Sequence, residues 1–89
     1  MPVIDPVIDS VITWLKRTAY IRATGEVVPD TELIARGILD SIEILNLVSY
    51  LEENFGIALP IDEFVPENFE TPRAIANLVV RLRPAVAAE

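Results

Sequence analysis

The chain has 89 residues, of which 52% are hydrophobic, and its seven basic and fourteen acidic side chains give a formal net charge of −7. This length fits one small domain, no charge-free run approaches the roughly 20 residues that cross a bilayer, and the N-terminus lacks a signal-peptide pattern. The absence of cysteine and histidine excludes disulfides, thiolate metal sites and the commonest general base. We therefore expect a single cytoplasmic domain over residues 1–89, with a core at 5–83, that is not an enzyme, holds no metal and does not insert into membranes.

The first predicted element is a helix of about four turns that begins near residue 5. Asp5 is a suitable N-cap, and Pro6 suits the first helical position because the N–H that it lacks is not needed there. We expect Trp14 to be partly buried by packing on this helix. Apolar residues recur at helical spacing along the segment: Val7, Ile8, Val11, Ile12, Leu15 and Ala19.

Residues 21–39 are predicted to form a long connection between the first two helices. Gly25 and Pro29 interrupt this stretch, and no helical period is sustained along it. We expect one short turn at residues 31–35. A connection of this length is unusual in a small domain and is often functional.

The second helix is the clearest prediction, with Asp40 as its N-cap. Residues 54–56, Asn-Phe-Gly, supply a stop signal, because glycine readily adopts the left-handed conformation that ends helices. Glu52 and Glu53 lie on the polar side. The apolar stripe that we expect to face the core consists of Ile44, Leu47, Val48, Leu51 and Phe55.

A second face of the same helix presents the hydroxyl of Ser41 in the first turn. A helix N-terminus suits a covalently attached phosphate, because first-turn N–H groups lack intrahelical partners and the helix dipole is positive there. Leu45 and Ser49 follow Ser41 at four-residue spacing, and Ile42 is its neighbour. If the other stripe is core, Ile42 and Leu45 stay partly exposed beside this hydroxyl. They then suggest a small patch for docking a partner, although single exposed apolar residues are common.

The last third of the chain is punctuated by prolines. Pro60 and Pro66 bracket a segment that can form only a short helix or turn, and we expect Phe64 and Phe69 to anchor it in the core. Thr71 is the predicted N-cap of a last helix. Residues 84–89 are expected to be a flexible tail, because Pro84 ends that helix. The apolar face of the last helix comprises Ile75, Leu78, Val79 and Leu82.

These elements predict an all-α fold. It consists of three main helices and one short helix between the second and the last, with a long loop between the first two. No window shows the strict alternation of a half-buried strand. The expected packing centre consists of Leu15, Leu47, Leu51, Phe55 and Leu78.

Charge is distributed unevenly along the chain. Residues 37–71 contain no lysine or arginine, and such a negative field repels nucleic acid and attracts basic protein surfaces. Plain solubility is the alternative explanation. The acidic residues in this stretch are Asp40, Glu43, Glu52, Glu53, Asp62, Glu63, Glu67 and Glu70.

The order of these elements and the residues at their joints resemble the acyl carrier protein family, which includes peptidyl and aminoacyl carriers. The matching stretches are Gly-Ile-Leu-Asp-Ser-Ile at 37–42, Leu-Glu-Glu-Asn-Phe-Gly at 51–56 and Phe-Glu-Thr-Pro at 69–72. An Asp-Ser dipeptide alone is weak, but its combination with Glu-Glu-x-Phe-Gly roughly fourteen residues later is specific. The resemblance covers residues 5–83 and implies an acyl-carrier-like four-helix bundle.

The resemblance also implies a function. A phosphopantetheinyl transferase would attach 4′-phosphopantetheine from coenzyme A to Ser41, and Asp40 matches the family's aspartate near the transferase's metal and coenzyme A. The thiol of the arm would carry an acyl or aminoacyl group as a thioester, loaded by an acyl- or aminoacyl-activating ligase (an adenylation enzyme) and used by downstream enzymes. We expect a monomer that binds no nucleic acid. The partner-binding positions that the resemblance implies are Ile42, Glu43, Leu45, Ser49, Glu52 and Glu53.

The residues before the serine indicate the type of carrier. Fatty-acid carriers usually read Leu-Gly-x-Asp-Ser-Leu, whereas here the glycine comes earlier, at Gly37, and Asn46 stands where such carriers often have an acid. Gly-Ile-Leu-Asp-Ser, Pro-x-x-Glu-Phe at 60–64 and Phe-x-Thr-Pro are more similar to free-standing D-alanyl or other aminoacyl carriers and to secondary-metabolite carriers. We expect a dedicated aminoacyl-transfer or secondary-metabolite pathway. A housekeeping fatty-acid carrier and an unmodified acidic interaction module are the alternatives.

Overall fold

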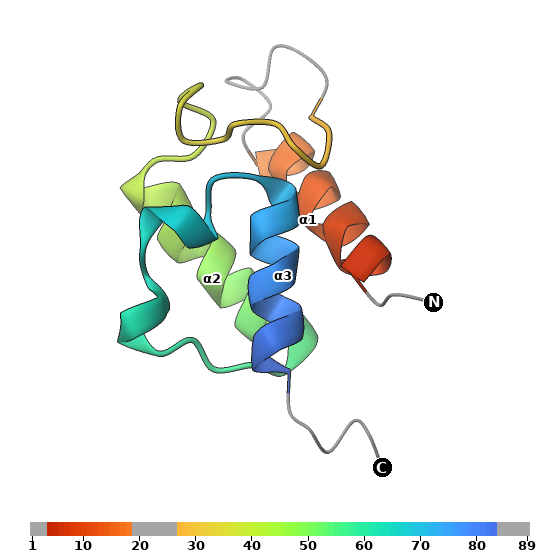
Figure 1. The fold of residues 1–89 in the computed structure, drawn as a ribbon, viewed down its shortest axis with the longest axis vertical. Helices are drawn as coiled ribbons and strands as arrows, with labels where there is room; N and C mark the ends of the chain where they lie inside the picture. The colour runs from red at the N-terminus through yellow and green to blue at the C-terminus, as the bar shows by residue number, and fades with distance from the viewer. Residues whose placement is uncertain (1–3, 19–26, 84–89) are drawn as a thin grey trace.

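The computed structural model describes residues 4–18 and 27–83. In these ranges the chain forms three α-helices, α1 (Ile4–Thr18), α2 (Ser41–Phe55) and α3 (Pro72–Leu82), and no strand (Figure 1). The all-α prediction is therefore confirmed. The predicted short helix between the second and third helices is instead a pair of three-residue 3-10 turns, η1 (Ile61–Glu63) and η2 (Pro66–Asn68). The predictions for Ala19, Gly25 and the tail after residue 83 fall outside the described residues.

The ends of α2 and α3 are formed by the residues that the sequence indicated. The Asp40 carboxylate accepts the Glu43 N–H at 2.8 Å, and the Thr71 hydroxyl accepts the Ala74 N–H at 3.0 Å. Gly56 ends α2 at a positive φ of 65°, with its N–H donating to the Glu52 carbonyl. Each cap satisfies a backbone group that the helix itself leaves over.

The beginning of α1 corrects one prediction. The helix starts at Ile4, so Asp5 lies inside the first turn and is not the N-cap. Proline is tolerated anywhere in a first turn, because no N–H there has an intrahelical acceptor, and Pro6 therefore does not fix the starting residue.

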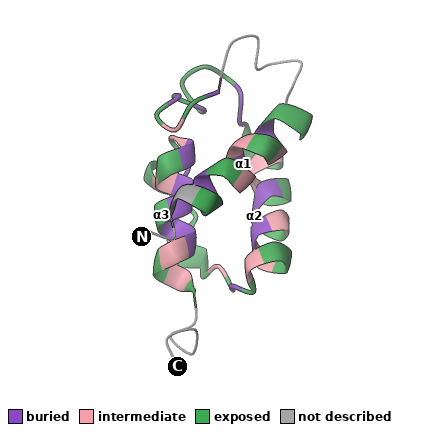
Figure 2. Ribbon diagram, turned by 90° about the vertical axis from the view of Figure 1, so that its right-hand side faces the viewer, coloured by how far each residue is buried: buried purple, intermediate pink, exposed green. Residues whose placement is uncertain are grey.

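The core lies where the three helices turn their apolar faces toward one another. Buried positions occupy the inward faces of the helices and exposed positions the outward faces (Figure 2), and α1 packs against α3. Phe55 from the predicted centre is only partly buried, and Trp14 packs at the edge with its ring 5.9 Å from that of Tyr50. The predicted core residues that are fully buried include Val11, Leu15, Leu47, Leu51, Ile75, Leu78 and Val79.

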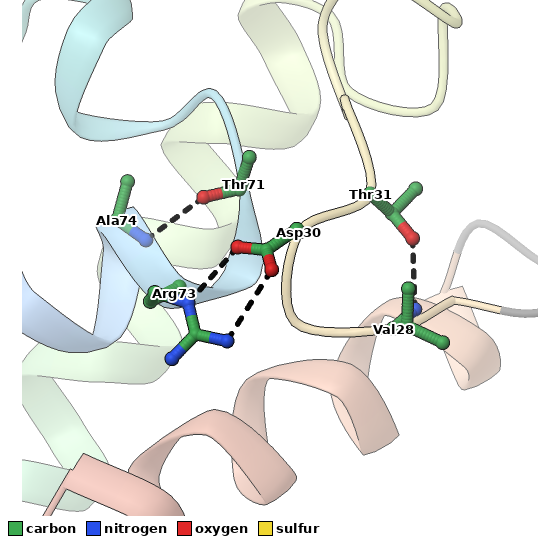
Figure 3. Close-up of polar contacts among 6 residues, drawn as sticks. All are labelled: Val28, Asp30, Thr31, Thr71, Arg73 and Ala74. Carbon is green, nitrogen blue, oxygen red and sulfur yellow. Dashed lines mark hydrogen bonds and ion pairs between the residues drawn. The ribbon is translucent and has the colours of Figure 1, made fainter.

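The connection before α2 is tied to the start of α3. The Arg73 N–H donates to the Pro29 carbonyl at 2.9 Å, and the Arg73 guanidinium reaches both carboxylate oxygens of Asp30, at 2.9 and 3.3 Å (Figure 3). Further along, the Leu33 N–H donates to the Glu70 carbonyl at 2.7 Å. A segment without regular structure is thereby fixed against a helix whose contacting residue, Arg73, lies 43 residues after Asp30 in the chain.

The turn in this connection lies later than predicted. Thr31 belongs to a preceding turn, in which its hydroxyl accepts the Val28 N–H at 2.8 Å (Figure 3). The main turn spans residues 33–37, and the Leu33 carbonyl accepts N–H groups from both Ile38 and Leu39. Gly37, with a φ of 73°, supplies the left-handed residue that lets the chain reverse toward α2.

The segment between α2 and α3 corrects the prediction for Phe64. Phe69 is buried in the core, with 1% exposure, as predicted. Phe64 is 37% exposed, and its ring contacts that of Phe69, with the ring centroids 6.5 Å apart. Phe64 falls between the two 3-10 turns, in a segment with no buried residue before Phe69. Asn68 joins the turns by donating to the backbone carbonyl and the carboxylate of Glu63.

Candidate functional site

Ser41 is the first residue of α2, and its side chain is exposed. Asp40 precedes it in extended conformation and occupies its own carboxylate with the Glu43 N–H, so the N-cap role is filled by Asp40 and not by the serine. The Ser41 hydroxyl consequently stands at the positive end of the helix dipole within reach of solvent. This is a position from which an enzyme can approach the oxygen.

An open, mainly apolar groove of about 520 Å³ begins beside this hydroxyl. Three separate segments form it: the end of the connection before α2, the first turns of α2, and the stretch around η2. Among the described residues, Asp40 and Ser41 are the polar ones that line it. Its apolar walls include Ile34, Leu39, Leu45, Phe64, Val65 and Phe69.

The predicted partner residues divide into an exposed set and a half-buried set. Ile42 is 70% exposed and Leu45 is 58% exposed, which agrees with the patch expected beside Ser41. Ser49 and Glu53 are also exposed. Glu43 is half-buried, and so is Glu52, whose carboxylate accepts the Leu59 N–H at 2.9 Å. The structure thus gives Glu52 an intramolecular role that sequence spacing does not reveal.

A second hollow, of about 430 Å³, lies next to the groove and shares Ile34 and Pro66 with it. Its carboxylates are Asp30, Glu32 and Glu70. The hydrogen bond from Arg73 lowers the pKa of Asp30 below the ordinary value of 3.8; desolvation opposes this shift, and the positive charge of Arg73 adds to it. Asp30 is therefore a carboxylate at neutral pH.

Sequence reasoning missed the far wall of the groove. Ile34 lies in a connection that has no period to show which residues are apolar on one side, and Phe64 was assigned to the core. Val65 lies in the predicted short segment between Pro60 and Pro66, and the sequence assigned it no role. The one available signal was the presence of three large apolar residues in segments too short to bury them completely.

Comparison with known proteins decides the family. Residues 7–79 match the model of the phosphopantetheine attachment site family, which is most of the chain. The chain belongs to this family. It is therefore a carrier protein and not an enzyme, and its prosthetic group is 4′-phosphopantetheine.

Named relatives include carriers of amino acids. A D-alanyl carrier protein of Bacillus velezensis is 38% identical over 55 residues, which covers 62% of this chain and 70% of the relative. Aminoacyl carrier protein 1 of Bradyrhizobium diazoefficiens is 34% identical over 65 residues, covering 72% of this chain and 71% of the relative. Lincomycin biosynthesis protein LmbN of Streptomyces lincolnensis is 35% identical over 75 residues, covering 84% of this chain and 27% of the relative.

Among solved structures, the carrier is similar to a chain in one described as the crystal structure of an FAD-dependent dehydrogenase. The TM-score is 0.72 and the identity 28%, and the match covers 80% of this carrier and all of the other chain. Within the described part of the carrier, no helix has both the length and the apolar character required to cross a membrane.

Proposed function

We propose that Ser41 is the attachment residue and that the carrier holds an aminoacyl or specialised acyl group for a dedicated aminoacyl-transfer or secondary-metabolite pathway in the cytoplasm. The observation that carries the first part is the exposed hydroxyl of Ser41 at the first position of α2, directly after an N-cap aspartate. A phosphodiester formed there lies at the positive end of the helix dipole.

The residues around Ser41 fit this role. The prosthetic group supplies a terminal thiol, which this cysteine-free chain lacks, and that thiol holds the cargo as a thioester. Asp40 keeps the first turn of α2 formed through the Glu43 N–H and leaves the hydroxyl of its neighbour outside the cap. The chain's own contribution is therefore to present one oxygen atom on a rigid helix end.

The proposed cargo class rests on the relatives and on the residues around the motif. Relatives named for D-alanine, amino acids and lincomycin biosynthesis all match over most of this chain, and Asn46 replaces the acid that fatty-acid carriers often have. The proposed partners are a phosphopantetheinyl transferase, an activating ligase and downstream enzymes. A flavin-dependent dehydrogenase is a candidate among the last, given the similar chain in a structure so described.

Intact-mass spectrometry tests the attachment residue. The apo protein is incubated with coenzyme A and a broad-specificity phosphopantetheinyl transferase, and we expect the wild type to gain the mass of one phosphopantetheine group and Ser41→Ala to gain none. Thr13→Ala, which removes an exposed hydroxyl of α1, is the control and should gain the same mass as the wild type. No gain in the wild type, or a full gain in Ser41→Ala, would contradict the proposal.

The cargo class requires a second measurement. Carrier purified from its native host is digested, and the peptide that contains Ser41 is weighed with its prosthetic group intact. We expect an aminoacyl or small specialised acyl thioester. A series of long, even-numbered fatty acyl groups would favour the housekeeping alternative and contradict this part of the proposal.

A further inference from the structure

The groove beside Ser41 and the acidic hollow form one continuous surface. Ile34 and Pro66 line both, so the two hollows adjoin at this pair of residues, which we call the Ile34–Pro66 ridge. The ridge joins the connection before α2 to the beginning of η2. A partner that binds at Ser41 and extends past Ile34 and Pro66 therefore reaches the acidic hollow.

The apolar part of this surface exposes more hydrophobic area than single surface residues usually do. Four large hydrophobic residues of the groove are at least one third exposed, and all line the same concavity as Ser41. Aliphatic and aromatic side chains gathered in one hollow are typical of sites that receive an apolar side chain from a partner. They are Ile34, Leu45, Phe64 and Val65.

The charged part of this surface indicates which charge the partner's side chain carries. Among the residues that the structure describes, no lysine or arginine lines either hollow, whereas Glu32 and Glu70 line the acidic one. The charge of Asp30, the third carboxylate there, is matched by Arg73. Glu32 and Glu70 therefore leave the hollow negative, which complements a lysine or arginine side chain.

This surface differs from the one predicted along α2. Glu52, in the last turns of that helix, is half-buried and engaged with the Leu59 N–H, so it is poorly placed to meet a partner. The groove instead lies toward η2 and the connection. Residues of three separate segments, and not a single helix face, then make up the docking area.

The position of Ser41 identifies the occupant. Enzymes that act on the thioester work at the end of a long arm and can bind elsewhere on the carrier. An enzyme that forms the bond between phosphorus and the Ser41 oxygen must bring its own atoms next to that oxygen, and it therefore covers the part of the groove that Ser41 lines.

We infer that the phosphopantetheinyl transferase docks across the Ile34–Pro66 ridge, with an apolar side chain in the groove and a lysine or arginine in the hollow of Glu32 and Glu70. This inference rests on the proposed role of Ser41. In the reaction, the Ser41 oxygen forms a bond to the phosphorus that bears the pantetheine. The adenosine bisphosphate portion of coenzyme A departs, and the serine proton passes to solvent or to a base of the transferase.

Charge reversal tests the acidic hollow. Initial rates of transfer from coenzyme A by a purified broad-specificity transferase are measured against apo-carrier concentration for Glu32→Lys/Glu70→Lys. The matched control, Asp9→Lys/Asp62→Lys, changes the net charge equally at two exposed acids outside both hollows. We expect KM to rise about five-fold for the first pair at low salt, with kcat nearly unchanged, and the effect to shrink at high salt.

Truncation tests the groove. Phe64→Ala should lower kcat/KM about five-fold, whereas Ile61→Ala, at a residue that is 84% exposed and outside the groove, should have no effect. Helical circular dichroism of each variant shows whether it is folded. If the groove served only the tethered group, Phe64→Ala would leave the modification of the apo protein unchanged, and the inference would be overturned.

The remaining outcomes are equally decisive. An equal rise in KM for both charge pairs would mean that net charge alone matters, and a larger effect of Glu53→Lys than of Glu32→Lys/Glu70→Lys would place the docking area along α2. Either result overturns the inference. Failure of the proposed function is distinguishable, because the wild type would then gain no mass at all.

Discussion

The α1–α3 layer and the Ser41 end of the molecule use the same aliphatic residue types for opposite purposes. In the layer, Leu15 and Leu78 have no exposed surface. At the Ser41 end, Ile42 and Leu45 keep more than half of theirs. Burial of each large aliphatic side chain contributes on the order of 2 kcal/mol, so the layer carries most of the stability. At the Ser41 end the exposed aliphatic side chains contribute less to stability and remain available to contact a partner.

Backbone anchoring differs between the two regions as well. The layer is held by side-chain packing, whereas the connection that supplies Ile34 to the groove is also held by backbone hydrogen bonds, such as the one from the Leu33 N–H to the Glu70 carbonyl. The two regions meet at Leu39 and Phe69, which line the groove and are also buried in the core. The separation of stability from contact is testable with single substitutions.

The largest effect is expected from a matched pair of leucine truncations. Leu78→Ala should lower the free energy of unfolding by about 2–5 kcal/mol, because it leaves a cavity in a fully buried site. Leu45→Ala should change it by less than about 0.5 kcal/mol, since 58% of that side chain is already exposed. Urea unfolding followed by circular dichroism measures both. Equal losses would show that the comparison is wrong.

A smaller effect is expected at Gly37, which lies between the two regions. A Cβ added there would meet no atom within 4 Å, so Gly37→Ala costs only the strain of a positive φ, about 1 kcal/mol. Gly37→Asn should cost less, because asparagine tolerates the left-handed region better. The same urea titration distinguishes them. A much larger loss for alanine than this would point to a packing role that the open space around Gly37 does not support.

The smallest effect is expected at the ion pair of Asp30 and Arg73, whose side chains are 72% and 49% exposed. The hydrogen bond from Arg73 lowers the pKa of Asp30 in the folded state, so its stabilisation is complete above the ordinary value of 3.8 and is lost as the pH falls through the lowered value. The stability difference between the wild type and Asp30→Asn should therefore be constant near neutral pH and shrink below about pH 4. A difference that grows on acidification would contradict this assignment.

The sequence predicted best where local signals and packing agree. Asp40, Gly56 and Thr71 mark helix ends through chemistry that operates within four residues, and the stripe of α2 follows the helical period. The exposed patch at Ile42 and Leu45 followed from the same period, because a helix with one buried stripe must turn another face outward.

The rest depends on contacts between segments distant in the sequence. The partner of the Glu52 carboxylate is a backbone N–H in the following loop, and the far wall of the groove comes from Ile34 in the connection and from Phe64. Neither segment has a period long enough to show which side is covered. Phe64 and Phe69 look alike in sequence, and only the placement of the two 3-10 turns decides which one is buried.

The double acceptance at Leu33 has a consequence for local motion. Its carbonyl takes the N–H groups of Ile38 and Leu39, both buried, while its own N–H is held by the Glu70 carbonyl at the start of α3. The amide hydrogens of Leu33, Ile38 and Leu39 should therefore exchange with deuterium as slowly as those at the start of α3, and more slowly than those of an open loop. The irregular stretch just before Ser41, residues 33–39, therefore belongs to the same cooperative unit as the last helix, and the two should open together.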